Sequence, residues 1–113
     1  REKVSHPMLR AFVFVAGLCC AQAVVWEVAD PRAQWDAREG HCLLAFADQL
    51  WILAGGSEQH GPLNDVFNST DGSSWAQVTP AAPWTARSGC GCVAFADQML
   101  IMGGNDGTSP LND

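Results

Sequence analysis

The sequence predicts an all-β fold built from a repeated four-stranded unit. The pentapeptide AFADQ occurs at residues 45–49 and again at 94–98. The match extends beyond it, because segments 35–55 and 84–104 agree at 11 of 21 positions. Within the first copy, apolar stretches of four to six residues alternate with turn-forming residues and show no helical periodicity. This pattern is typical of a repeat of short strands.

The first half of the unit predicts a hairpin. The apolar stretches His41–Phe46 and Leu50–Ala54 flank the polar break Ala47–Gln49, and the second stretch ends at Gly55-Gly56. Runs of this length suit buried strands, since a helix would need ten or more residues.

The second half predicts another hairpin. Asp65–Ser69 and Trp75–Val78 flank the segment TDGSS, in which Asp71-Gly72 is a strong turn signal. Four short strands in about 50 residues are typical of a β-propeller blade.

The repeat also sets the expected domain organisation. We expect a lead-in at 24–34, a first blade unit at 35–83 and the first half of a second unit at 84–113. Propellers close with about four to eight blades, so we expect this chain to be a propeller fragment whose parent continues after Asp113. The bare blade faces of such a fragment favour aggregation.

The first unit contains, in this order, a hydrophobic strand, a glycine doublet, a loop, an aromatic residue and a Trp. This order resembles the Kelch repeat, and the resemblance implies four-stranded antiparallel blades. The sequence has no Tyr, and Cys90 stands where the first unit has His41. The motif positions are Gly55, Gly56, Phe67 and Trp75, with Gly103 and Gly104 in the second unit.

The segment Ser69–Trp75 also resembles the Asp-box turn of sialidase-like propellers, with one residue missing after Asp71. Both resemblances imply the same fold class. Trp35, Trp75 and Trp84 lie near the unit boundaries, where we expect them to bury the seams between blades.

The first residues predict a secretory signal peptide. Lys3 and Arg10 precede an apolar run at 11–20, and Ala21-Gln22-Ala23 follows as a cleavage site after Ala23. Met8 is a candidate start. The apolar run is shorter than the roughly 20 residues of a membrane span. We therefore expect a secreted, extracellular protein with no span in its mature chain.

Charge and motif content exclude several classes of function. The formal net charge of −6 argues against a nucleic-acid partner. Arg38 and Arg87 occupy one repeat position, so we expect each to pair with a carboxylate or a loop carbonyl within its unit. Asp48 and Asp97 are expected to cap hairpins. No catalytic constellation is identifiable, so we predict no catalytic residues and no cofactor.

The cysteines and histidines do not predict a metal site. His41 and His60 lack a second ligand at useful spacing, and Cys90-Gly91-Cys92 alone does not give four ligands. The expected mature chain keeps three cysteines. The repeat aligns Cys42 with Gly91, so Cys90 and Cys92 point to the opposite strand face, and a disulfide from Cys42 to either is not favoured.

Asn68-Ser69-Thr70 is a glycosylation sequon, meaningful only in a chain that enters the secretory pathway. We expect Asn68 at an exposed hairpin tip.

The leading functional hypothesis is a secreted, non-enzymatic Kelch-like module that binds a protein or glycan partner through its loops. The loop at 57–64 differs between units while the strands do not, and specificity is normally carried by such loops. The alternative is a fragment of a propeller enzyme, galactose oxidase-like or sialidase-like, whose catalytic residues lie outside this chain. The candidate ligand-binding residues are Ser57, Glu58, Gln59 and His60.

Overall fold

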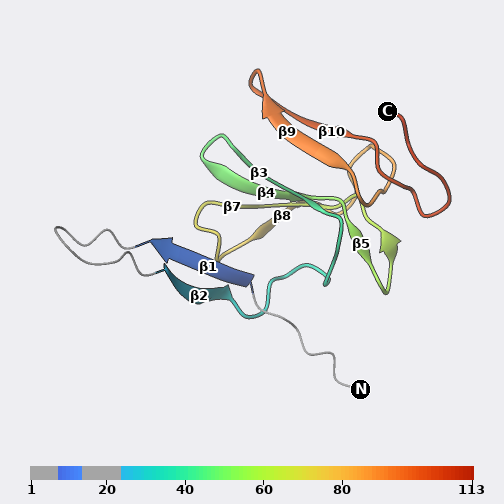
Figure 1. Ribbon diagram of the computed structural model, residues 1–113. Helices are drawn as coiled ribbons and strands as arrows, with labels where there is room; N and C mark the ends of the chain where they lie inside the picture. Colours follow the sequence, from blue (N-terminus) through green and yellow to red (C-terminus); the bar gives the residue numbers. More distant parts are fainter. Residues whose placement is uncertain (1–7, 14–23) are drawn as a thin grey trace.

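The computed structural model describes residues 8–13 and 24–113, with side chains from Trp26 onward. The described residues form ten β-strands and no helix (Figure 1). Every strand pairing between them is antiparallel. The predicted all-β fold class, a β-propeller fragment of Kelch type, is confirmed.

One four-stranded sheet forms the first blade. Its strands run as a meander in the order β3–β4–β7–β8. Each begins and ends within one residue of the predicted stretch, because glycine, proline and polar turn residues bound every apolar run. Their bounds are Cys42–Phe46 (β3), Gln49–Leu53 (β4), Val66–Ser69 (β7) and Ala76–Thr79 (β8).

The turn between β3 and β4 is shorter than the sequence suggested. Phe46 pairs directly with Gln49, so the loop contains only Ala47 and Asp48. Both have positive φ, 51° and 58°, as a type I′ hairpin turn requires. Ala96 and Asp97 repeat this geometry at 47° and 58°. Gln49 is therefore the first residue of β4 rather than part of the break.

The second unit contributes a two-stranded hairpin. β9 (Gly91–Phe95) pairs with β10 (Gln98–Met102), and β9 contacts β3 of the first blade. Figure 1 shows this hairpin (orange) beside β3. The two units thus stack as neighbouring blades do.

A disulfide joins the two units, although the sequence did not favour one from Cys42. It links Cys42 in β3 to Cys92 in β9, with a Cα–Cα distance of 5.8 Å. The two cysteines do occupy opposite faces of equivalent strands. Because the strands belong to neighbouring sheets, opposite faces are the ones that meet across the seam. Side chains on opposite faces diverge only when their strands belong to one sheet.

The remaining strands form two small ribbons. β5 (Gly56–Ser57) pairs with β6 (Gly61–Pro62) in the loop after β4. β1 (Met8–Val13) pairs with β2 (Val24–Asp30). The predicted cleavage site at Ala23 lies outside the described residues, so the signal peptide stays a prediction. None of the described segments is a helix of the length and hydrophobicity needed to cross a membrane.

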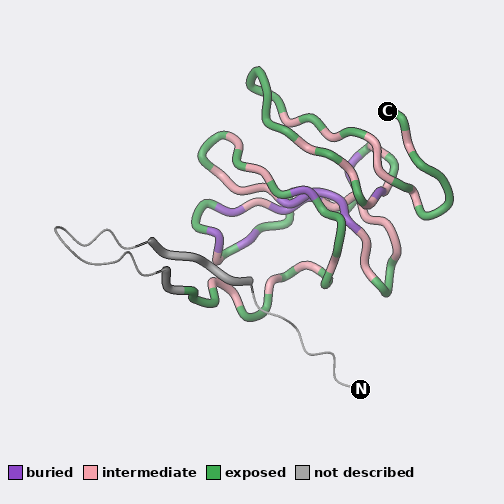
Figure 2. Tube along the Cα trace, viewed as in Figure 1, coloured by how far each residue is buried: buried purple, intermediate pink, exposed green. Residues whose placement is uncertain are grey.

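The first blade has a separate buried cluster on each face (purple in Figure 2). Ile52, Phe67 and Trp75 form one cluster, against which Trp35 and Leu50 pack. The other faces the second unit and includes the half-buried Trp84; its buried members are Cys42, Leu53, Val66 and Ala82. Trp84 therefore lies in the seam between the units, as expected. Trp75 is buried, but on the face turned away from the second unit.

Candidate binding surface at the loop end of the blade

Loops and turns lie at the two ends of the blade. The β3–β4 turn lies at one end, and β4 then runs from Gln49 to Leu53 and leads into the loop at the other. The predicted ligand-binding residues 57–60 belong to that second end, which we call the loop end.

A buried arginine holds the base of the loop end. The Arg38 guanidinium donates to both carboxylate oxygens of Asp65, at 2.6 and 2.9 Å, and to the carbonyl of Ala54 at 3.0 Å. Its side chain is only 2% exposed. A bidentate pair of this kind fixes geometry as well as charge. Arg38 therefore ties the segment before β3 to the end of β4 and to Asp65, which directly precedes β7.

The second unit repeats this arrangement. Arg87 donates to both carboxylate oxygens of Asp113, at 2.8 and 3.0 Å, and to the carbonyl of Gly103 at 3.0 Å. The hydrogen bonds from Arg87 hold the pKa of Asp113 below its ordinary value. Both arginines thus have the structural role predicted for them, and neither forms an open anion site. A signal for their partners was present in the sequence, because Asp65 and Asp113 recur in the repeated PLND.

The glycine doublets are staggered between the units. Gly55 and Gly104 are equivalent, with φ of 99° and 92°. A Cβ on Gly55 would lie 2.9 Å from the Cβ of His41, so the position is closed to other residues. The residue before this equivalent glycine is Ala54 in the first unit and Gly103 in the second, and their φ angles are 59° and 62°. Gly56 belongs to β5 instead, where it exchanges backbone hydrogen bonds with Glu39.

The candidate loop residues line a shallow cleft against the segment before β3. The cleft has a volume of about 250 Å³. His60 holds the loop in place: its Nδ1 lies 2.6 Å from Oδ2 of Asp36, and its backbone N–H donates to Ser57 Oγ at 2.9 Å. The Asp36 side of this cleft was not predicted, because no local sequence pattern links residues so far apart in the chain. The lining residues are Trp35, Asp36, Ala37, Ser57, Glu58 and Gln59.

The equivalent loop of the second unit is built differently. Asp106 Oδ1 accepts hydrogen bonds from the backbone N–H groups of Thr108 and Ser109, at 2.8 and 2.7 Å, and from Thr108 Oγ1 at 2.7 Å. These bonds lower the pKa of Asp106. One loop is therefore held by a contact to the preceding segment and the other by its own aspartate.

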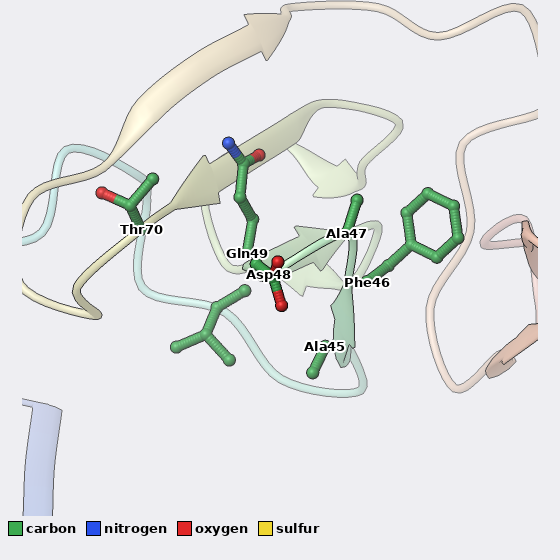
Figure 3. A pocket seen from close by; sticks show the side chains of 7 residues that line it. Ala45, Phe46, Ala47, Asp48, Gln49 and Thr70 are labelled. Atoms are coloured by element: carbon green, nitrogen blue, oxygen red, sulfur yellow. The ribbon is translucent and has the colours of Figure 1, made fainter.

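The opposite end of the blade carries a larger hollow, shown in Figure 3. Its volume is about 360 Å³, and Asp48 and Gln49 line it together with Thr70 from the β7–β8 turn. Asp48 lies in the hairpin turn, where we expected a cap. Asn68 was expected at an exposed tip, but it lies within β7, half-buried, and its Nδ2 donates to Gln49 Oε1 at 2.8 Å. Glycosylation of Asn68 stays a prediction.

The turn between β7 and β8 is held by Asp71. Its Oδ1 accepts hydrogen bonds from the backbone N–H groups of Ser73 and Ser74, both at 2.7 Å. These bonds lower the pKa of Asp71 to about 2. The segment that resembles an Asp-box is thus a turn whose backbone is held by hydrogen bonds to the Asp71 carboxylate. Trp75, the last residue of this segment, is buried, and so is Phe67, two residues before the segment begins.

The comparisons agree with this geometry. Residues 86–113 match the family model of the Kelch motif. No curated protein matches the chain. The matched residues contain Arg87, the β9–β10 hairpin and the Gly103-Gly104 pair, and each has an equivalent in the first unit. The Kelch resemblance is confirmed for residues 86–113, which match the Kelch motif.

Proposed function

We propose that this chain is a secreted, non-enzymatic Kelch module that binds a protein partner through its loop end. One observation supports the proposal most: a common framework of arginine, glycine and strand residues carries loops that differ between the units. Residues 57–59 line an exposed cleft, whereas Asp106 of the equivalent loop accepts hydrogen bonds from the loop's own backbone. Variable loops on a rigid scaffold are where proteins commonly place recognition.

The charge at the loop end favours a basic partner. Asp36, Glu39 and Glu58 are exposed there, while the nearby Arg38 is buried and paired with Asp65. Complementary charge steers encounter and specificity at protein interfaces. The partner surface is therefore expected to carry Lys or Arg, and binding is expected to weaken as salt rises.

A photo-crosslinking amino acid placed either in the loop end or in a turn at the opposite end of the units tests this proposal. Gln59 is exposed at the loop end, and Asp97 is exposed in the β9–β10 turn. The variant at Gln59 is expected to crosslink a discrete protein from secretory-pathway extracts, and Glu58→Lys is expected to reduce that product. Equal crosslinking from Asp97, or an unchanged product with Glu58→Lys, would contradict the assignment of the loop end.

The non-enzymatic part of the proposal has a separate test. The purified chain is expected neither to oxidise primary alcohols in the presence of copper nor to release sialic acid. Either activity, retained after repurification and lost on unfolding, would favour the enzyme alternative.

A further inference from the structure

Three cysteine sulfurs gather in the seam between the two units. The Sγ atoms of Cys42, Cys90 and Cys92 all lie within 4.8 Å of one another. Cys42 and Cys92 form the disulfide, and the Sγ of Cys90 lies 3.5 Å from that of Cys42. Cys90 is the free cysteine of the described residues. The cluster therefore combines a disulfide with a third thiol in direct contact with it.

The sulfurs form a compact triangle rather than a line. Attack by Cys90 on the disulfide would require the attacking, central and leaving sulfurs to be collinear. With a disulfide bond of about 2.0 Å, the outer two sulfurs would then be roughly 5.5 Å apart. The outer two sulfurs lie within 4.8 Å of each other, so the three sulfurs are not in line for thiol–disulfide exchange. Once the disulfide is reduced and the Cys42 and Cys92 sulfurs separate, three sulfurs this close suit ligands around one ion, because thiolates about 2.3 Å from a metal lie roughly 4 Å apart.

The surroundings of the triangle favour a soft cation. Cys42 is 5% exposed, and its cluster is apolar: Leu53, Val66 and Ala82 are buried with it, and Trp84 packs against them. No histidine or carboxylate of the described residues joins the three sulfurs. An all-thiolate site selects Cu⁺ or Zn²⁺ among common metals. Zn²⁺ in structural sites takes four protein ligands, whereas three thiolates satisfy a trigonal Cu⁺ ion.

We propose that reduction of the Cys42–Cys92 disulfide converts this seam into a three-thiolate site for Cu⁺. A dithiol reductant supplies two electrons and two protons, becomes a disulfide itself and leaves Cys42 and Cys92 as thiols. Cu⁺ then replaces the three thiol protons of Cys42, Cys90 and Cys92, which are released to the solvent, and forms three copper–sulfur bonds. The two blades are joined by a disulfide under oxidising conditions and by the metal under reducing conditions.

The test uses the full chain carrying Cys19→Ser and Cys20→Ser, so that only the three seam cysteines remain. After anaerobic reduction and removal of the dithiol, Cu⁺ is supplied from a chromogenic chelator. The reduced chain is expected to take one Cu⁺, and the oxidised chain none. Cys90→Ser is expected to weaken uptake at least about 100-fold, since even residues that only support metal ligands are worth 10–100-fold. Cys90→Ser leaves the disulfide intact, so its fold can be checked before reduction.

A second measurement separates a folded site from capture by an unfolded chain. Cu⁺ is expected to protect the amide hydrogens of β3 and β9 from exchange, and X-ray absorption is expected to show a sulfur-only copper environment. Absence of uptake by the reduced chain, uptake by Cys90→Ser equal to that of the parent, or uptake without amide protection would each overturn the proposal.

Discussion

Arg38 and Arg87 have the same structural role in the two units: each pairs with an aspartate that lies later in its unit. Each guanidinium is almost fully buried and is matched to a carboxylate that lies 26 or 27 residues later in the chain. The role of the arginines could be predicted from their repetition. Their partners could have been predicted as well, because Asp65 and Asp113 repeat with them. The stagger of the glycine doublets follows from the same alignment, but the positive φ of Ala54 could not be predicted, because residues with a Cβ rarely adopt it.

Asp65→Asn is expected to destabilise the fold strongly. It leaves the Arg38 charge buried with only carbonyl partners, and breaking a buried pair typically costs about 3–5 kcal/mol. The matched control is Asp36→Asn, because the side chains of the Asp36–His60 pair are 44% and 60% exposed, respectively. Such a surface pair is worth at most about 1 kcal/mol. Urea denaturation of both variants measures the difference, and equal losses would refute the anchoring role of Arg38.

Gly55→Ala is expected to cost more than Gly61→Ala. Both glycines have positive φ, 99° and 66°, but only Gly55 also meets a neighbouring side chain. A Cβ at Gly61 has nothing within 4 Å. The left-handed backbone alone costs about 1 kcal/mol for Ala, whereas strain together with the clash at Gly55 should exceed about 2 kcal/mol. Thermal denaturation compares the pair; the reverse order would show that the close approach to His41 relaxes easily.

At the scale of elements, the strands of the blade were predictable because turn signals bound each apolar run. The two-residue turn was misjudged because Gln49 is polar and was counted with the break, although it pairs with Phe46. The β5–β6 ribbon was not predicted, since its strands contain two residues each and carry no apolar pattern. The disulfide was missed because strand alternation describes one sheet and not the contact between two.

Trp75→Ala is expected to destabilise the blade by about 3–5 kcal/mol, the usual cost of removing a buried aromatic side chain. Trp75 is 5% exposed, and its ring packs at 90° to that of Trp35 with centroids 4.6 Å apart. Trp26→Ala is the control, because Trp26 is 63% exposed. A loss below about 1 kcal/mol for Trp75→Ala in urea denaturation would exclude this ring from the core.

The β7–β8 turn is expected to weaken in acid. The pKa of Asp71 is about 2 in the folded chain and 3.8 in its ordinary state, so its contribution to stability is present above pH 3.8 and is lost as the pH falls towards 2. Asp71→Asn should therefore reduce stability near neutral pH and flatten the pH dependence within this window. Urea midpoints measured across the window, with Asp48→Asn as a control for charge loss in another turn, test this. An unchanged slope in Asp71→Asn would contradict it.

At the scale of the whole molecule, the second unit presents an apolar face. Val93, Phe95, Leu100 and Met102 are 43%, 69%, 36% and 49% exposed. They alternate along β9 and β10 with residues that face the first blade, such as Cys92. Their equivalents in the first unit are Leu44, Phe46, Trp51 and Leu53, of which Leu44, Trp51 and Leu53 belong to the cluster that contacts the second unit. The repeat thus assigns an occupant to this face, namely a further blade of the same kind.

In a solution of this chain alone, the blade available to that face belongs to a second copy, so the chain is expected to self-associate as its concentration rises. Phe95→Asp should weaken the association about 10- to 100-fold, because burying a Phe side chain is worth about 1.5–3 kcal/mol. Val78→Asp is the matched control, since Val78 is 51% exposed but lies on β8 of the first blade. Sedimentation velocity over a concentration series measures both. A chain that stays monomeric throughout, or that responds equally to Val78→Asp, would show that the exposed face of β9 and β10 is not a surface for blade stacking.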